Sequence, residues 1–479
     1  MRKLTNTLVF VVFLVGLVIP GSWAGAQSAT GQTWTSSITY YTPSDSAGNL
    51  SIVYYDGLTT YTAGPFAMNP HAAGSVSVGS TSGMPDGFAG SAVLSADVPI
   101  VATYVQYSKN ETASYSRVFY SGFDESKAGS TFYLPTVRAN GVTTSTVGVQ
   151  NVESFEITAT LDFYAVGASS PTFTHEQDIK PNASYVSALP DIPEYPGGSF
   201  DGSLVVNAAE KGEPSTPGRV VASAQETQDN GRGVFGYEGS KEGATTAYVP
   251  TATCNRAAFQ GTSYLAIQNA GSATAQVKVS YYDTAGTKVG EMPETPINEG
   301  AKLQTNPCQQ SLLVNALGSA VVESTNGVPI IVIGKYATND GLITAFTCES
   351  AGSLNVAAPY IRWAADPTTN YRAYIAVMNV GSGAATSIVA RYYDASGTER
   401  GSETLASGGA PLGQFIKANT NPSTAGALIG GSFGISPFGG AVEIESDQPV
   451  VVLVRLTTNP SGLEVATLGE DYNGAATAP

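Results

Sequence analysis

The sequence has few of the residues that carry chemistry in enzymes. Its 479 residues include two histidines, three cysteines and three tryptophans, and only 13% of them are charged. Acid–base or nucleophilic catalysis needs a group that titrates near neutral pH, together with an orienting partner. His71 and His175 lie in Pro- and Thr-rich surroundings in different parts of the chain, and we interpret each as a loop residue. Since no Gly-x-Ser-x-Gly elbow occurs either, we predict no catalytic residues and no enzymatic activity.

Patterns that bind metals or cofactors are missing as well. Cys254, Cys308 and Cys348 are separated by 54 and 40 residues, which matches no zinc knuckle. Calcium would be the expected metal of an acidic exported protein, but there is no Asp-x-Asp-x-Asp-Gly loop. We therefore predict neither a metal site nor a cofactor.

Carboxylates that could act as a glycosidase pair have simpler explanations. Asp283 and Asp394 each belong to a Tyr-Tyr-Asp-x-x-Gly element, in which the aspartate caps a hairpin turn and the glycine supplies a positive φ. Glu443 and Glu445 alternate with apolar residues, as on the solvent face of a strand. We interpret all four as structural residues.

Aromatic residues are mostly tyrosine, with 25 in the chain. Trp34, Trp363 and the tyrosine pairs could form a platform on which sugars stack, but a β-sandwich also needs aromatics for its own core. We favour core positions for the tyrosine pairs. Trp363 lies in a variable loop and is the candidate for an exposed, ligand-binding aromatic side chain.

The first 26 residues have the layout of a secretory signal peptide. Arg2 and Lys3 precede an apolar run over residues 8–19, and small residues follow at Ala24 and Ala26. Those 12 residues are too few to cross a bilayer, which takes about 20. We expect cleavage after Ala26, secretion with association to the cell surface, and no membrane span in the mature chain.

The mature chain is strongly acidic. Without Arg2 and Lys3 the 22 basic residues fall to 20, against 38 acidic ones, which gives a net charge of −18. Nucleic acid is therefore excluded as a partner, because its phosphates must be neutralised by Lys and Arg.

Internal repeats organise the chain. Segments that begin TFYLPTV at Thr131, TAYVPTA at Thr246 and AAPYIRW at Ala357 line up with one another. Each reaches an asparagine, namely Asn151, Asn269 and Asn379. An aromatic strand end and a Gly-led pair of strands follow, and an earlier fourth copy has these later elements as well. The asparagines are 118 and 110 residues apart, which gives the length of the module.

Each copy consists of short alternating runs bounded by Gly, Asn, Pro and Asp, and none has a helical period. About seven strands in about 110 residues are typical of an immunoglobulin-like sandwich, which can bury its own core. We predict an all-β protein with four tandem immunoglobulin-like β-sandwich domains after a signal peptide at 1–26. The expected domain bounds are 27–121, 122–236, 237–349 and 350–470, with a flexible tail at 471–479.

Three cysteines in an exported chain permit one disulfide and leave one residue over. Cys254 lies between the first two strands of the third copy and Cys308 follows its fifth, so their loops share one end of the sandwich. We prefer a Cys254–Cys308 bridge, with Cys348 free or intermolecular. A bridge from Cys348 to either of the other two stays open.

The shared elements resemble a known family. Val-x-Asn-x-Gly, then Tyr-Tyr-Asp-x-x-Gly, then a Gly-Ser-Ala-Val-Val strand pair are similar to tandem immunoglobulin-like repeat proteins of bacterial cell surfaces. They also resemble the cell-adhesion-related domain found in bacteria. The likeness covers nearly the whole mature chain but consists of turn and core residues. It implies the fold and a surface location, and hardly constrains activity.

Two classes of function fit these expectations. The first is a non-enzymatic extracellular scaffold protein, whose partners are other copies of itself or cell-envelope components. The alternative is an adhesin or a carbohydrate-binding surface protein, with glycans as partners. Because the first copy lacks its first strand and residues 472–479 resemble a linker into a new copy, self-assembly by head-to-tail strand donation is a further hypothesis.

Overall fold

The computed structural model describes residues 10–14, 33–57, 59–109, 115–228, 233–256, 260–339, 341–362, 372–406, 415–418, 439–458 and 468–477. In these ranges the fold is all-β and sandwich-like, and the helical elements are short 3-10 turns. None of the helices found there has the length and apolar character needed to cross a membrane. Trp363 and the expected cleavage site at Ala24 and Ala26 lie outside the described residues.

The strands fall into four successive blocks, numbered here along the chain. Block 1 contains β1 (Phe10–Leu14), β2 (Thr33–Tyr41), β3 (Gly48–Tyr55), β4 (Thr60–Met68), β5 (Ala73–Ser77), β6 (Ser91–Ala96), β7 (Val101–Lys109) and β8 (Tyr115–Ser121). After β9 (Phe123–Asp124), block 2 contains β10 (Thr131–Ala139), β11 (Thr143–Asn151), β12 (Ile157–Ala165), β13 (Phe173–Ile179), β14 (Ser184–Ala188), β15 (Phe200–Glu210), β16 (Glu213–Pro217), β17 (Val220–Gln228) and β18 (Val234–Glu238).

The second half of the chain continues in the same way. Block 3 contains β19 (Thr246–Thr253), β20 (Thr262–Asn269), β21 (Ala275–Asp283), β22 (Lys288–Ile297), β23 (Lys302–Thr305), β24 (Leu317–Ser324), β25 (Ile330–Ala337) and β26 (Ile343–Thr347). Block 4 contains β27 (Ser353–Ile361), β28 (Arg372–Asn379), β29 (Ile388–Asp394), β30 (Glu399–Ala406), β31 (Phe415–Ala418), β32 (Gly440–Thr458), β33 (Leu468–Asn473) and β34 (Ala475–Ala476).

Every block repeats one strand order in two layers. In block 1 the layers run β4-β3-β6-β1 and β5-β2-β7-β8. Block 2 has β13-β12-β15-β10 with β14-β11-β17-β18, and block 3 has β22-β21-β24-β19 with β23-β20-β25-β26. Block 4 has β30-β29-β32-β27, and its long β32 continues into the second layer beside β28 and β33. The internal repeat of the sequence is therefore a repeat of topology.

The Tyr-Tyr-Asp-x-x-Gly elements form hairpins, as predicted. Asp283 Oδ1 accepts hydrogen bonds from the backbone N–H groups of Ala285 and Thr287, both at 2.9 Å. Gly286 has φ +81°, which favours glycine because it has no Cβ. Asp394 repeats this arrangement between β29 and β30. The turn interpretation of both aspartates is confirmed.

The recurring asparagines end the second strand of their blocks and are fully buried. Each Nδ2 donates to the carbonyl oxygen four residues later, at 2.7 or 2.8 Å. Each Oδ1 accepts from the backbone N–H two residues later. The buried amide therefore satisfies backbone groups of the following loop, which explains its place in the repeat.

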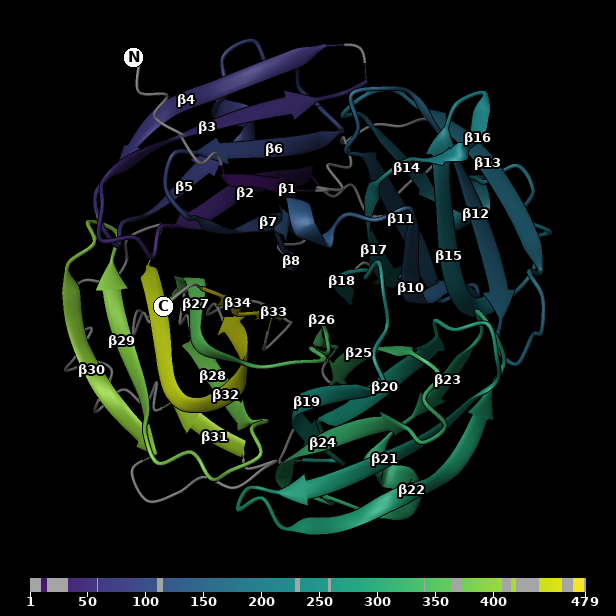
Figure 1. Cartoon of the computed structure of the whole chain (residues 1–479), viewed down its shortest axis with the longest axis vertical. Coiled ribbons are helices and arrows are strands. Elements are labelled where there is room, and N and C mark those ends of the chain that lie inside the picture. The colour runs from purple at the N-terminus through teal and green to yellow at the C-terminus, as the bar shows by residue number, and fades with distance from the viewer. Residues whose placement is uncertain are drawn as a thin grey trace, which may run out of the picture.

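The four blocks close into a ring (Figure 1). One strand of each block lies at the centre, namely β8, β18, β26 and β33, and each packs against the next, with β33 against β8. We call these four strands the hub, and the contacts between neighbouring blocks joints 1–2, 2–3, 3–4 and 4–1. The chain itself passes through the first three joints, whereas joint 4–1 is made by contacts alone.

Neighbouring blocks share their hydrophobic cores. Ile333 and Ala345 of block 3 belong to the core cluster of block 2, and Val234 of block 2 belongs to that of block 1. Tyr41 and Phe119 of block 1 pack into the core of block 4. Apolar interfaces of this kind fix the relative positions of domains, so the blocks are not independent domains joined by flexible linkers.

Two expected boundaries are wrong. Residue 236 falls inside β18 and residue 470 falls inside β33, because both strands belong to the hub. Residues 471–476, expected in a flexible tail, instead complete β33 and form β34. Tyr472 is only 2% exposed, and Ala475–Ala476 pairs with β27. The segment was predicted to be a flexible tail because its composition is polar. Its charged residues are tolerated in a buried strand because they have partners inside the ring.

Candidate functional site

Equivalent residues of the hub strands connect neighbouring blocks. Ser121, Glu238, Thr347 and Asn473 hold the same register position in β8, β18, β26 and β33. The Ser121 N–H donates to the Glu238 carboxylate, and Thr347 Oγ1 donates to the Glu238 carbonyl oxygen at 2.6 Å. Asn473 Nδ2 donates to the Thr347 carbonyl oxygen at 2.5 Å. This level of the hub is therefore a chain of hydrogen bonds from block to block.

A cavity of about 1150 Å³ opens at this end of the hub. The segments that follow the hub strands line it, at residues 122–124, 239–244, 349–350 and 474–477. Its charged lining residues are Asp45, Asp124, Glu238, Glu242, Glu349, Lys127 and Lys241. Ligand pockets commonly span about 300–1000 Å³, so the space suffices for a small or extended ligand. Acidic residues exceed basic ones there, which favours polar or cationic ligands over anionic ones.

Sequence reasoning missed this cavity because the linkers looked like ordinary solvated connections. Their mutual similarity was the available signal, since equivalent linkers of a closed ring meet on its axis.

Burial raises the pKa of Glu238 above its ordinary value, although the N–H of Ser121 opposes the shift. Within the described ranges, no group of three or more His, Cys, Asp and Glu side chains could hold a metal ion.

Joint 2–3 buries a cluster of ions. Lys335 Nζ lies 3.1 Å from Glu226 Oε1, and the two side chains are 7% and 1% exposed. Burial lowers the pKa of Lys335 to about 7, against the attraction of Glu226. Burial alone would raise the pKa of Glu226, but Lys335, Arg138 and Lys302 hold it below its ordinary value. Because Lys335, Glu226 and Lys302 do not line the cavity, we interpret their altered pKa values as a consequence of packing.

Joints 3–4 and 4–1 also bury carboxylates of β33. At joint 3–4, Thr344 of block 3 donates to Asp471 Oδ2 at 2.7 Å, whereas the ion pair of Asp471 lies within block 4. Asp471 accepts two hydrogen bonds from Arg455, at 2.7 and 2.6 Å, and its side chain is fully buried. Its neighbour Glu470 lies 3.0 Å from Arg117 of block 1. Burial raises the pKa of Glu470 to about 7, although Arg117 lowers it. The hub position of β33 explains why both carboxylates are buried.

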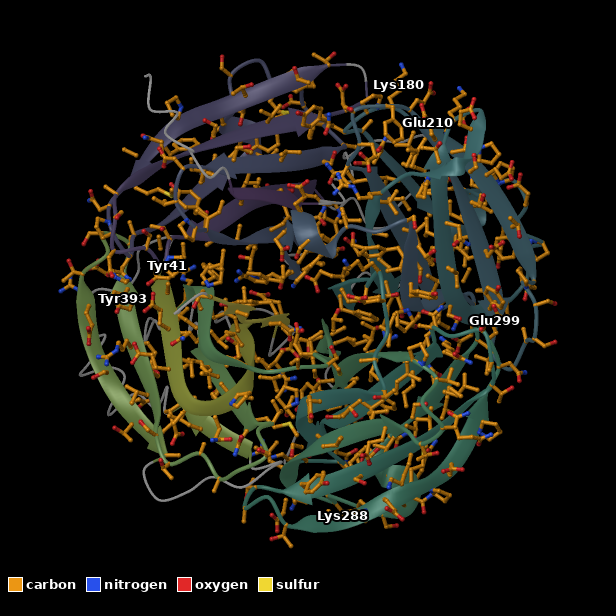
Figure 2. All side chains as sticks on the ribbon, in the orientation of Figure 1. Tyr41, Lys180, Glu210, Lys288, Glu299 and Tyr393 are labelled. Atoms are coloured by element: carbon orange, nitrogen blue, oxygen red, sulfur yellow. A yellow bond between two sulfur atoms is a disulfide. The ribbon has the colours of Figure 1, made fainter. Side chains whose placement is uncertain are left out.

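The outer part of joint 4–1 is held by tyrosine, glutamate and histidine. Tyr41 Oη donates to Glu443 Oε1 at 2.6 Å, and His71 Nδ1 lies 3.2 Å from the same carboxylate oxygen. The His71 ring stacks on Tyr393 with centroids 4.7 Å apart, and its Nε2 lies 2.9 Å from Asp45. Figure 2 labels Tyr41 and Tyr393, which lie where blocks 1 and 4 meet.

The solvent-face interpretation of Glu443 is therefore wrong, because ring closure places it in a joint. Glu445, two residues on, is exposed and pairs with Arg391 at 3.3 Å, as a solvent-facing residue should. The interpretation of His175 as a loop residue is wrong as well. It lies in β13, is 7% exposed, and its Nδ1 is 2.6 Å from Glu194.

The structure joins Cys254 and Cys308, the pair that we preferred, with their Cα atoms 5.2 Å apart. Cys348 is free and only 7% exposed, because it directly follows the hub strand β26, where its N–H donates to the Val332 carbonyl oxygen at 2.8 Å. Its burial argues against an intermolecular bridge.

The tyrosine pairs supply core residues rather than a platform. Tyr54, Tyr281 and Tyr392, which begin three of these pairs, are each 1% exposed. Trp34 is partly buried and packs against the core of block 1. The preference for core positions is confirmed for these three tyrosines.

Comparisons with known proteins do not identify a family for this chain. No protein-family model and no curated protein sequence matches the chain. The crystal structure of Thermotoga maritima 1070 is similar over 24% of this chain and 92% of its own, with 13% identity and a TM-score of 0.20. That of CfaE, the adhesive subunit of CFA/I fimbria of enterotoxigenic Escherichia coli, covers 49% of this chain and 87% of its own, with 8% identity and a TM-score of 0.10.

Proposed function

We propose that this chain is a non-enzymatic scaffold protein exported to a bacterial cell surface, and that its working unit is a closed ring of four immunoglobulin-like sandwich domains. The closed ring is the observation that supports this most directly. Each joint combines apolar core residues from both blocks with hydrogen-bonded or ionic groups. Such a unit keeps its shape under load, which suits a structural role more than catalysis.

The chemistry of the buried groups supports the same function. Buried titratable residues such as Glu226, Lys335 and Glu470 hold blocks together instead of facing the cavity. An enzyme would need such groups within reach of a substrate. Partners are then other copies of the ring or cell-envelope components that contact its outer surface.

Assembly through the C-terminus has less support than the sequence suggested. Ala475–Ala476 pairs with β27 of the same chain, and Tyr472 Oη donates to the Tyr360 carbonyl oxygen at 2.5 Å. A segment engaged in this way is not free to join a second subunit.

Cell fractionation and small-angle scattering test the proposal together. We expect the protein in the surface fraction of a bacterial host, processed near Ala26, and absent from that fraction when residues 1–26 are deleted. The purified protein should scatter as a compact ring. Retention inside the cell would contradict export, and an extended profile of four separated domains would contradict the ring.

The cavity favours a second candidate function, that of an adhesin or carbohydrate-binding protein. Its volume of about 1150 Å³ and its polar lining suit a hydrophilic ligand. Ser126→Trp would fill part of the cavity, whereas Ser169→Trp on an exposed turn leaves it unchanged. Binding to a glycan array that is lost in the first variant and kept in the second would support this function over a purely structural one.

A further inference from the structure

Blocks 2 to 4 each place their first strand between two partners. β10 pairs with β15 on one side and bridges to Ser240, after the hub strand, on the other. β19 pairs with β24 and bridges to Glu349. β27 pairs with β32 and with β34. We call this location the first-strand position.

In block 1 this position is occupied by β1, whose residues Phe10–Leu14 belong to the apolar run of the export signal. β1 pairs with β6 and with β9. Its register is also that of the other blocks: Phe13 stands opposite Phe123 and Val93, as Tyr133 stands opposite Ser240 and Val205. The agreement on both sides identifies β1 as the first strand of block 1.

The rest of block 1 contains no replacement among the described residues. β2 starts at Thr33 and belongs to the other layer, so β6 without β1 pairs with β3 alone. By register, Val12 and Leu14 hold the positions of Phe132 and Leu134, both fully buried in block 2. The first-strand position therefore requires an extended, apolar segment, and an unpaired edge beside it is a template for another strand.

We propose that block 1 of the exported protein presents an open first-strand position between β6 and β9, which binds an extended apolar segment of about five residues from another polypeptide. This inference rests on the proposed export, since removal of residues 1–26 takes β1 away. Residues 27–32 read QSATGQ and are polar, and Ala475–Ala476 is paired with β27.

A synthetic peptide tests the position directly. The probe carries residues 8–16, LVFVVFLVG, followed by three lysines for solubility. The matched control replaces Val12 by proline, which removes one ladder N–H and cannot lie in a central strand. We expect the chain 27–479 to bind the probe at one site per molecule, with a rise in melting temperature. The proline peptide should bind at least about tenfold more weakly, which corresponds to one lost hydrogen bond.

The chain 1–479, made without export and therefore unprocessed, is the control for specificity. It carries β1 in place, and we expect it not to bind the probe. Equal binding of probe and proline peptide, binding of the probe by the unprocessed chain, or no binding by the chain 27–479 would each overturn the proposal. If the chain 27–479 folds only when the probe is added, that outcome supports it.

Mass spectrometry of the exported protein separates this inference from the function on which it rests. A surface protein that keeps residues 10–14 would have its first-strand position filled by its own chain, so the inference would fail while the scaffold function stood. A protein that stays inside the cell would contradict the function, whereas peptide binding by the chain 27–479 would still measure the open edge.

Discussion

Tyr41 donates a 2.6 Å hydrogen bond to Glu443 across joint 4–1, although 402 residues separate them in the sequence. At joint 3–4 the same two register positions are held by Met378 and Val321, which pack in one apolar cluster. The joint that the chain does not cross is therefore closed by a directional, charge-assisted bond. Such a bond fixes the relative orientation of blocks 1 and 4, which no linker holds together.

Replacing Tyr41 and Glu443 by the methionine and valine found at joint 3–4 tests how much their hydrogen bond stabilises joint 4–1. Tyr41→Met alone should destabilise the protein by about 2 kcal/mol, because Glu443 loses a hydrogen bond to a charged group. Tyr41→Met with Glu443→Val should recover most of that loss, since a well-packed apolar pair can replace a buried polar one. Urea denaturation of both single variants and the double variant gives the coupling energy.

Glu445→Gln is the matched control, because Glu445 lies on the same strand but is exposed. We expect its effect to stay within about 0.5 kcal/mol. Additive effects of Tyr41→Met and Glu443→Val would mean that the two side chains do not cooperate across the joint.

The stability of the ring should depend on pH through Glu470. Burial raises its pKa from the ordinary 4.5 to about 7. Between these values the folded protein binds more protons than the unfolded chain, so the free energy of unfolding falls as pH rises from 4.5 to 7. The fall from this residue is up to about 3 kcal/mol. Glu470→Gln should make the melting temperature less dependent on pH over this range. An unchanged dependence would contradict the raised pKa of Glu470.

Local features of the fold could be predicted from the sequence because they depend on neighbouring residues. The Asp283 turn needs only the glycine three positions later, and strand order within one block favours the Cys254–Cys308 pairing that the structure shows. Ring closure depends instead on residues such as Tyr41 and Glu443, whose partners are hundreds of positions away. The burial of Asp471 likewise depends on the packing of β33 against β26, where Thr344, 127 positions away in the sequence, donates a hydrogen bond to its carboxylate.

The cysteines provide a test of the covalent structure. Cys348 is buried, and burial raises the pKa of its thiol above the ordinary value, so native protein should not react with a thiol reagent. We expect one reactive thiol per chain in denaturant and three after reduction. Two or more reactive thiols in unreduced, denatured protein would contradict the Cys254–Cys308 bridge.

Removing that bridge should lower stability without changing the fold. The bridge closes a loop with a sequence separation of 54 residues. Chain entropy then predicts a loss of about 4 kcal/mol on changing both cysteines to serine. Thermal unfolding of this variant measures the loss, and Cys348→Ser, which leaves the bridge intact, is the comparison. An equal loss in the two variants would mean that packing, not loop closure, explains the effect.

Burial, rather than distance, should decide how much an ion pair contributes to the ring. Lys335 and Glu226 are 3.1 Å apart and almost fully buried, whereas Lys288 and Glu291 are 2.6 Å apart and 43% and 49% exposed. Glu226→Gln leaves a buried ammonium without its carboxylate and should cost about 3 kcal/mol. Glu291→Gln should leave the midpoint of urea denaturation almost unchanged, despite the shorter distance, because solvent screens this exposed pair.

The loss in Glu226→Gln should also depend on pH. Removing the carboxylate takes away the attraction that opposes desolvation of Lys335, so the pKa of the lysine falls further below its present value of about 7. A lysine with a lowered pKa makes the folded protein less stable as pH falls, because the unfolded chain takes up the proton more readily. The variant should therefore lose more stability at pH 6 than at pH 9 in urea denaturation. Equal losses at the two values would place the cost in packing rather than in the buried charge.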